Sequence, residues 1–381
     1  MEDDAGLGTI ELWLNRTLNH SKLAVEYGAT GLMGIHWRTA EVAPQVSGLA
    51  KFPWNHSLTS LDAWRLFFAA EIGEGVAERA AQIFSAHADS YEMPRPDTWG
   101  GGSPGIDGPG EIRDQCPGNS SWEPPLARYD FVEQFHALRT QITDPGALSR
   151  FDLWDAHVRV ARHQTLVGCD WNTLEWCIDG IPAKNASSAA ARAAAAKKCL
   201  PSRVKLIKST ALLVNALLAS VGSAGTIGSV QNLMQHTFPL MLGLTQTQLE
   251  SALGEPLPPA ALPPSKYTGL ERLFVLTARL RAEKGRSLQV KGVLLSQHVV
   301  SSAATPTLHH RPMGSSVAWT NVTMHPKMAG RGVFLATIGA AAMQGAVEYY
   351  LSCELPGSTL VWPATAPAVP HTVVVAAAIE R

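Results

Sequence analysis

Three residues suited to ligand binding stand in a row where a hydrophobic stretch ends. His36, Trp37 and Arg38 follow the apolar run "GLMGI" at 31–35. A tryptophan offers a flat apolar surface to a sugar or another ring, and His36 and Arg38 can hydrogen-bond hydroxyls or a carboxylate. The pattern indicates a substrate-binding rim at the end of a strand. It is equally typical of a structural role, in which Trp37 packs under helices and Arg38 caps a backbone carbonyl.

Three consecutive acidic residues offer acid or base chemistry. Glu2, Asp3 and Asp4 precede a predicted helix at 9–27. If that helix follows a strand of an α/β barrel, the three acids lie at the C-terminal end of the strand, on the same face as Trp37. They are therefore candidate catalytic residues or acceptors for sugar hydroxyls. The alternative is electrostatic, because acidic residues before a helix stabilise its N-terminus.

A long segment at 93–118 is dense in glycine and proline. Loops of this length in a compact region are usually functional or disordered. Arg95 and Trp99 in it are candidate substrate-binding residues, since an arginine and an aromatic ring on a glycine-rich loop can adapt to a flat polar ligand. The alternative is a plain connection exposed to solvent.

Two helical stretches also carry grouped polar residues. In "SRFDLWDAH", Arg150 and Asp152 are too close in sequence to face each other on a helix, so a structural role is favoured. The stretch "VQNLMQH" at 230–236 is unusually polar for a packed helix, which indicates either a buried hydrogen-bond network or part of a pocket.

No motif predicts a metal or a cofactor. The sequence has no GxSxG, no P-loop, no GxGxxG after a predicted strand, and no CxxC or Cys/His spacing of the zinc type. The adjacent histidines His309 and His310 would point to opposite faces of a strand and could not share one metal ion. We therefore expect neither a metal nor a cofactor.

Composition and charge exclude several partner classes. A chain of 381 residues is long enough for more than one hydrophobic core. Its formal net charge of -1 gives no overall field that would recruit nucleic acid or an anionic membrane. No apolar run approaches the roughly 20 residues that a membrane-spanning helix needs.

Asparagine acceptor sites point to the secretory pathway. Asn-x-Ser/Thr triplets, of which chance predicts roughly one or two, occur at Asn15, Asn19, Asn55, Asn119, Asn185 and Asn321. The first residues lack the basic and apolar regions of a signal peptide. We therefore expect a secreted or extracellular glycoprotein that is truncated relative to a longer chain.

The five cysteines are too few and too scattered to predict a disulfide scaffold. Cys169 and Cys177 are predicted on one helix, about 12 Å apart along its axis. Bridged cysteines need Cα atoms within about 7 Å, so this pair is not expected to form a disulfide.

Hydrophobic periodicity divides the chain into regions. Residues 1–52 read as helix, strand and helix, the order of βα units in a parallel sheet or an eight-stranded α/β barrel. Residues 53–257 follow a helical pattern, residues 258–268 form a proline-rich linker, and residues 269–381 alternate with the period of short strands. The predicted fold class is multi-domain α+β: the end of a partial TIM-like α/β barrel, a mainly helical middle region and a C-terminal immunoglobulin-like β-sandwich.

The helical region allows two local predictions. Phe151, Trp154, Val158 and Ala161 recur at helical spacing and predict one buried face. Pro201 follows an alanine-rich stretch and favours a break or a kink in the helix.

Several stretches, spread in order over nearly the whole chain, resemble a family of large microbial proteins of glycoside-hydrolase type. They are "MEDDAGLGTIELWLNRT", "YGATGLMGIHWRT", "PQVSGLA", "PRPDTWGGG", "GPGEI", "RFDLW", "GTIGSVQNLMQH", "LGEPLP", "EYYLSCELPGSTLVWPATAP" and "TVVV". No single stretch is diagnostic of one activity. The resemblance implies that "MEDD" closes the seventh strand of a barrel and that "GLMGIHW" is the eighth. Most of the barrel, with its main acid/base pair, would then be absent from this chain.

The leading hypothesis is the C-terminal portion of a secreted glycoside hydrolase that acts on a polysaccharide or a glycoconjugate and is incomplete as a catalyst on its own. Carbohydrate is then the expected partner, and Trp37 the sugar platform. The alternative is a non-catalytic extracellular glycoprotein for carbohydrate binding or cell-surface assembly. A helical regulatory protein of the cytosol is a third hypothesis.

Overall fold

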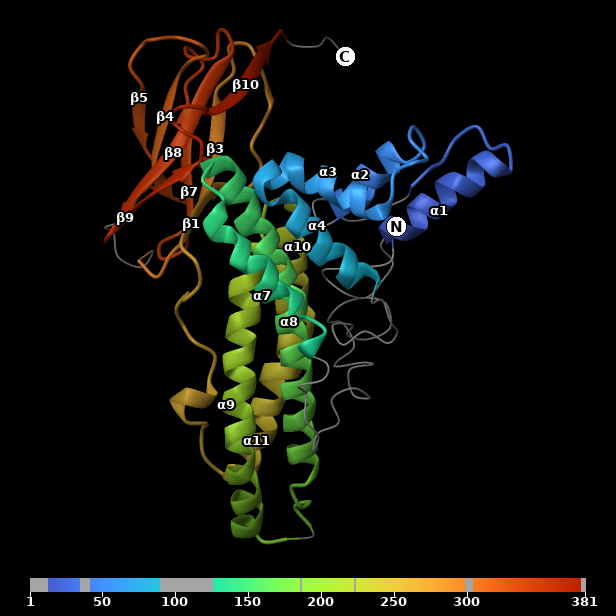
Figure 1. The fold of residues 1–381 in the computed structure, drawn as a ribbon. Helices are drawn as coiled ribbons and strands as arrows, with labels where there is room; N and C mark the ends of the chain where they lie inside the picture. Colours follow the sequence, from blue (N-terminus) through green and yellow to red (C-terminus); the bar gives the residue numbers. More distant parts are fainter. Residues whose placement is uncertain are drawn as a thin grey trace. The chain divides into compact units, whose positions relative to one another are not determined.

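The computed structural model describes residues 13–34, 42–89, 126–185, 187–222, 224–298 and 304–377 (Figure 1). These residues divide into a helical unit and a strand unit. The helical unit takes its described residues from Met1–Thr143, Arg150–Val221 and Gly225–Pro264, and the strand unit takes its own from Asp144–Ser149, Gly222–Ala224 and Ser265–Arg381. The chain is therefore a mixed α+β protein, as the sequence predicts at that level.

Helices dominate the described residues up to Leu253. They are α1 (Trp13–Glu26), α2 (Ala43–Lys51), α3 (Ser60–Ile72), α4 (Glu74–Asp89), α7 (Phe131–His136), α8 (Pro145–Asp179), α9 (Ala189–Ala219), α10 (Ala224–Asn232) and α11 (Thr245–Leu253). Between and after them lie the short 3-10 helices η2 (Ala137–Gln141) and η5 (Pro259–Ala261) and the π-helical segments η3 (Leu233–Thr237) and η4 (Pro239–Leu244). Among the described residues, no helix is both long and apolar enough to span a bilayer.

The strand predicted at 31–37 is absent from those of its residues that the structure describes. Residues 31–34 have no regular secondary structure, and residues 35–41 lie outside the described ranges. Gly31 and Gly34 give this stretch no side chain to pack at two of its four positions, and glycine weakens a strand for that reason.

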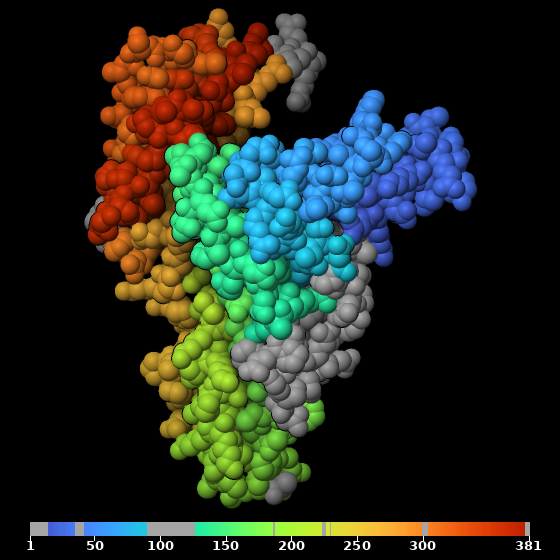
Figure 2. Space-filling model, viewed as in Figure 1, coloured from blue at the N-terminus to red at the C-terminus, as the bar shows by residue number. Residues whose placement is uncertain are grey.

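A cluster of aromatic rings joins α3, α4, α7 and α8. Phe68, Phe84, Phe135 and Phe151 are fully buried. The ring centroids of Phe68 and Phe84 lie 4.7 Å apart, those of Phe84 and Phe135 5.0 Å, and those of Phe135 and Phe151 4.5 Å. Edge and offset contacts of this kind stabilise a core beyond the area that they bury. In Figure 2, α3, α4 and α7, in light blue to green, adjoin one another on the surface of the helical unit.

Helix α8 is buried on every side over most of its length. The predicted apolar face is confirmed, since Phe151, Trp154, Val158 and Ala161 are at most 5% exposed. The other sides are buried too, for residues 167–172 are buried without interruption. The buried polar residues of this helix include Asp155, His157, His163, Gln164, Asp170 and Asn172. An amphipathic surface helix would leave such residues in water.

His163 of α8 is neutral in the folded protein at pH 7. Burial lowers the pKa of His163 from 6.5 to about 4, and the charges of Arg162 and Arg159 act in the same direction. The Glu133 carboxylate opposes them weakly. The Nδ1 atom of His163 is buried and has no hydrogen-bond partner, so nothing there stabilises a bound proton.

The sequence predicts a break or a kink at Pro201. Helix α9 continues through this residue, so the break is wrong, while the kink stays a prediction. Its first turn is capped by Ser188, whose hydroxyl accepts a hydrogen bond from the Ala191 N–H at 3.2 Å. Proline removes one intrahelical hydrogen bond, but the alanines before it are strong helix formers. On the other side of the proline, Arg203 and Leu206 are fully buried. Helix propensity and packing together outweigh the missing bond.

Arg203, a residue of α9, anchors both α11 and the segment that follows α11. It is 0% exposed. Its Nε donates to the Ala261 carbonyl in η5 at 3.1 Å, and its Nη1 donates to Thr245 Oγ1 in α11 at 2.6 Å. Burial lowers the pKa of Arg203 to about 10, so the guanidinium still carries its charge at pH 7.

A disulfide joins α8 to α9. Cys177 and Cys199 are bonded, with their Cα atoms 5.6 Å apart and a sequence separation of 22. Cys169 also belongs to a disulfide, although the sequence predicts no disulfide scaffold and names no bonded pair. Cys169 and Cys177 do lie on one uninterrupted helix and are not bonded to each other, as predicted. Cys353 is a free, buried thiol, and burial raises its pKa to about 11.

The strand unit contains two sheets. Its strands are β1 (Arg272–Val275), β2 (Arg281–Glu283), β3 (Leu288–Leu295), β4 (Thr307–Pro312), β5 (Thr320–Thr323), β6 (His325–Pro326), β7 (Val333–Ile338), β8 (Val347–Leu355), β9 (Ser358–Trp362) and β10 (His371–Ala376). One sheet has the order β1-β3-β7-β6, and the other has the order β2-β10-β8-β4-β5, with β9 paired to β8. All pairs are antiparallel except β2 with β10.

Both sheets contribute to one hydrophobic core. Leu288 and Phe334 come from the first sheet, and Leu308, Leu351 and Val373 from the second. Along β8 the residues alternate, with odd-numbered side chains in the core and the even-numbered ones on the other face. The predicted opposition of the two histidines in β4 is confirmed: His310 is buried and His309 lies on the outer face.

We predict that His163 makes stability depend on pH. The unfolded chain takes up a proton at this histidine below about pH 6.5, whereas the folded protein does so only near pH 4. Falling pH therefore favours unfolding across this window, by on the order of 3 kcal/mol in total. Urea unfolding of wild type and His163→Leu at pH 7 and pH 5 measures the difference. The exposed His20→Gln is the control, and an equal pH dependence in wild type and His163→Leu contradicts the prediction.

We predict that the disulfide between α8 and α9 contributes about 3 kcal/mol to the free energy of unfolding, because it closes a loop of 22 residues in the unfolded chain. The double variant Cys177→Ser/Cys199→Ser, measured by chemical denaturation, is expected to lose that amount. Lys198→Ala changes an exposed neighbour of Cys199 and is expected to leave stability unchanged. An unaltered midpoint in the double variant contradicts the assignment.

Candidate functional site

The residues predicted from sequence as catalytic or substrate-binding lie outside the described ranges. They are Glu2, Asp3, Asp4, His36, Trp37, Arg38, Arg95 and Trp99, and the acceptor Asn119 lies outside as well. Their roles stay predictions.

The acceptor asparagines that the structure describes differ in surroundings. Asn19, Asn55, Asn185 and Asn321 are exposed, whereas Asn15 is half-buried and donates its Nδ2 to Asp89 Oδ1 at 2.9 Å. Asn55 Oδ1 accepts hydrogen bonds from the N–H and the hydroxyl of Ser57, the third residue of its own triplet, at 3.1 and 2.6 Å. Its amide nitrogen is left free for modification.

The polar groups of "SRFDLWDAH" hold helices together. Arg150 Nε donates to the Glu71 carbonyl of α3, and Asp152 accepts a two-pronged bond from Arg139 at 2.7 and 2.9 Å. Trp154 packs edge-on against Phe67 at 5.3 Å. The structural role predicted for these residues is in keeping with these contacts.

The stretch "VQNLMQH" is not a buried network. Gln231, Gln235 and His236 are exposed, and none of the three lines the pocket described below. The apolar Leu233 between them is buried, so the segment packs by one side only.

A second ion-pair network links α7 to α8. Asp155 Oδ2 accepts from Arg159 Nε at 2.9 Å and lies 3.1 Å from His136 Nδ1. Arg159 also donates to both carboxylate oxygens of Glu133, at 3.1 and 3.5 Å. The Asp155 oxygen that faces the histidine is thus shared with a guanidinium. The network is suited to holding two helices rather than to acid–base chemistry.

The outer face of the larger sheet in the strand unit carries three interlocked rings, which we call the aromatic face: His309 of β4, Trp319 before β5, and Tyr350 of β8. The rings of His309 and Tyr350 are stacked, with centroids 4.2 Å apart and planes 10° apart. Trp319 stands nearly perpendicular to Tyr350, at 89° and 4.8 Å. Cross-strand pairing explains the stack, because His309 and Tyr350 are direct partners in the β4–β8 register.

Hydrogen bonds fix the His309 ring over the sheet. One ring nitrogen, Nδ1, lies 2.7 Å from Asn321 Oδ1 of β5, and the other, Nε2, lies 2.8 Å from Ser352 Oγ of β8. The imidazole thus bridges the two strands that flank its own. Its orientation is set on both sides before any ligand arrives.

A charged pair borders the rings. The Arg311 guanidinium lies 4.1 Å from the centroid of Trp319, a cation–π distance, and donates through Nε to Glu348. Glu348 also accepts a longer bond from the Gly314 N–H at 3.4 Å. The Glu348 side chain is 9% exposed and that of Arg311 23% exposed, so the pair is partly shielded from water.

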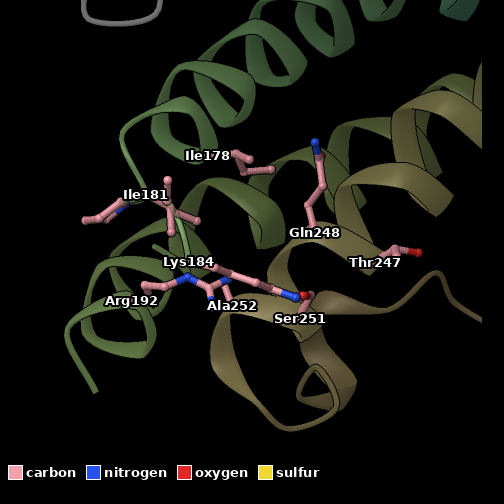
Figure 3. Close-up of a pocket in the computed structure, with 10 residues that line it drawn as sticks. Ile178, Ile181, Lys184, Arg192, Thr247, Gln248, Ser251 and Ala252 are labelled. Carbon is pink, nitrogen blue, oxygen red and sulfur yellow. The ribbon is translucent and has the colours of Figure 1, made fainter. Parts of the chain in front are cut away.

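A pocket of about 370 Å³ lies in the helical unit, between the end of α8, the start of α9 and α11 (Figure 3). It is lined by Ile178, Ile181, Pro182, Ala183, Lys184, Arg192, Thr247, Gln248, Ser251 and Ala252. In Figure 3 the Lys184 side chain extends toward Ser251, whereas Thr247 points away from both. Two cationic side chains therefore share one cavity.

Both sites were missed from the sequence for the same reason. The aromatic face combines residues 309, 319 and 350, and the pocket combines residues 184, 192 and 251. No spacing rule joins residues that meet only through strand register or helix packing. Within the described ranges, no group of three or more His, Cys, Asp or Glu side chains could hold a metal ion.

Comparison with known protein families and with curated protein sequences finds no match to this chain.

Proposed function

We propose that this chain binds carbohydrate through the aromatic face of its strand unit, as part of a secreted protein of glycoside-hydrolase type that acts on a polysaccharide or a glycoconjugate. The observation that carries the proposal is the stack of His309 on Tyr350 beside the perpendicular Trp319. The same observation supports the alternative, a non-catalytic extracellular protein that binds carbohydrate.

Sugar rings have apolar faces of C–H groups and a rim of hydroxyls. Aromatic rings match the apolar faces, and fixed polar groups match the hydroxyls. The aromatic face offers both within one sheet surface, since the rings are bordered by Asn321, Ser352 and the Arg311–Glu348 pair. Because His309 is already held on both sides, little side-chain freedom is lost on binding.

Two features support an extracellular location. Disulfides persist in oxidising compartments such as the extracellular space. The chain contains one between Cys177 and Cys199. The acceptors Asn19, Asn55, Asn185 and Asn321 are exposed, as attachment of a glycan requires.

The finer architecture is part of the same proposal. We take the two sheets as an immunoglobulin-like β-sandwich because they share one core and are built mainly from antiparallel pairs. We take residues 1–52 as the end of an α/β barrel, on the resemblance alone. Trp37 and the acids Glu2, Asp3 and Asp4 then belong to the rim of that barrel, as sugar platform and polar groups.

We predict that Trp319→Ala weakens binding of oligosaccharides by about 1 to 3 kcal/mol, by analogy with aromatic stacking on other flat ligands. The measurement screens the protein on an array of neutral and acidic oligosaccharides and follows the best ligand by calorimetry. The protein is made in a bacterial periplasm, so that disulfides form and Asn321 carries no glycan.

Two controls separate binding from folding. Trp54→Ala removes a tryptophan that is 90% exposed in the helical unit and is expected to leave the affinity unchanged. Trp319→Phe keeps an aromatic ring and is expected to retain most of the affinity. Equal binding by wild type and Trp319→Ala, with both folded by circular dichroism, would sink the proposal, as would an array on which wild type binds nothing.

A further inference from the structure

The pocket of Figure 3 collects positive charge that no described residue neutralises through an ion pair. Lys184 and Arg192 both line it, and no acidic side chain does. Neither cation forms an ion pair with any residue in the described part of the chain. Elsewhere in the same unit, the arginines Arg139 and Arg159 are held by carboxylates. The contrast marks Lys184 and Arg192 as cations that lack a counter-charge.

Arg192 adds a second, independent observation. Its Nε atom is buried and has no hydrogen-bond partner. A guanidinium N–H removed from water without an acceptor costs free energy that a bound acceptor would restore. An oxyanion is the acceptor that fits best, because the fork of N–H groups on arginine matches two oxygens of a carboxylate, sulfate or phosphate.

The rest of the lining favours an organic molecule over a bare ion. Ile178 and Ile181 supply an apolar wall, and Ser251, toward which Lys184 extends, supplies a hydroxyl. The volume of about 370 Å³ falls within the range of small-molecule pockets. The ligand then has a charged oxygen group at one end and a compact body of carbon at the other.

The disulfide keeps the cationic wall in place. Every lining residue from Ile178 to Arg192 lies inside the loop that Cys177 and Cys199 close, and the remaining ones lie on α11. A covalent closure limits how far Lys184 and Arg192 can separate when the pocket is empty. The two like charges are therefore held together, which lowers the cost of ordering them around a ligand.

We propose that this pocket is a binding site for a small organic anion, whose oxyanion group is held by Lys184 and Arg192 and whose body packs on Ile178 and Ile181. Carboxylates and sulfate or phosphate esters share this chemistry. The inference concerns the helical unit and does not depend on carbohydrate binding by the aromatic face.

The test uses ligand-observed NMR with four aromatic probes at constant ionic strength: benzoate, phenyl sulfate, phenyl phosphate and neutral benzyl alcohol. At least one charged probe is expected to bind at least tenfold more tightly than benzyl alcohol. Preference for benzoate assigns a carboxylate, and preference for an ester assigns sulfate or phosphate. Failure of all three charged probes to bind, or binding of benzyl alcohol as tight as theirs, overturns the proposal.

Matched variants locate the binding. Lys184→Gln and Arg192→Gln remove one charge each and are expected to weaken the charged probe at least tenfold. Lys197→Gln removes the charge of an exposed lysine on α9, the helix that carries Arg192, but outside the pocket lining. It is expected to have no effect. Thermal unfolding of each variant verifies that it is folded. Affinity that is the same in wild type, Lys184→Gln and Arg192→Gln shows that the pocket is not the site.

Discussion

Burial of α8 on all sides is the constraint around which the helical unit is arranged. A helix with a free face can leave its polar residues in water, but this one must satisfy them internally or suppress their charge. Arg139 and Arg159 neutralise Asp152 and Asp155, whereas burial keeps His163 uncharged. Near its C-terminal end the same helix is tied covalently to α9, which places the pocket lining between two fixed helices.

The two candidate sites solve opposite problems. On the aromatic face nearly every polar group already has a partner, so recognition there relies on preorganised surface and on exchange of water for ligand. In the pocket, the buried Arg192 Nε has no hydrogen-bond partner and Lys184 is exposed to water, so the recognition proposed there relies on electrostatic attraction. A face of the first kind tolerates related ligands, whereas a pocket of the second kind selects by charge.

Sequence patterns predicted the parts of this fold that depend on local periodicity. The apolar repeat of α8 and the opposed histidines of β4 follow from the pitch of a helix and the pleat of a strand, and both are confirmed. The partner of Cys177 depends on which turn of α9 lies opposite it, and that is set by packing rather than by spacing. Pro201 shows the same limit. The lost backbone hydrogen bond was foreseen from the sequence, but the compensation from neighbouring alanines and buried side chains was not.

The candidate sites could not be predicted from the sequence, because their residues come from separate strands or helices. His309 and Tyr350 are neighbours only through the register of β4 on β8. The residues that were predicted from the sequence as catalytic or substrate-binding all lie outside the described ranges. They were chosen as polar or aromatic residues at the predicted ends of strands or on a long glycine-rich loop, and neither rule can find a site on the face of a sheet.

The state of Cys353 bears on how the disulfide endures. Thiol–disulfide exchange begins with attack by a thiolate, and a buried thiol with a pKa of about 11 is almost wholly protonated at neutral pH. Cys353 is therefore a weak nucleophile toward the Cys177–Cys199 bond at neutral pH. Since it is the free cysteine of the described residues, exchange of that bond depends mainly on thiols from other molecules, and the external redox environment then sets how long the bond lasts.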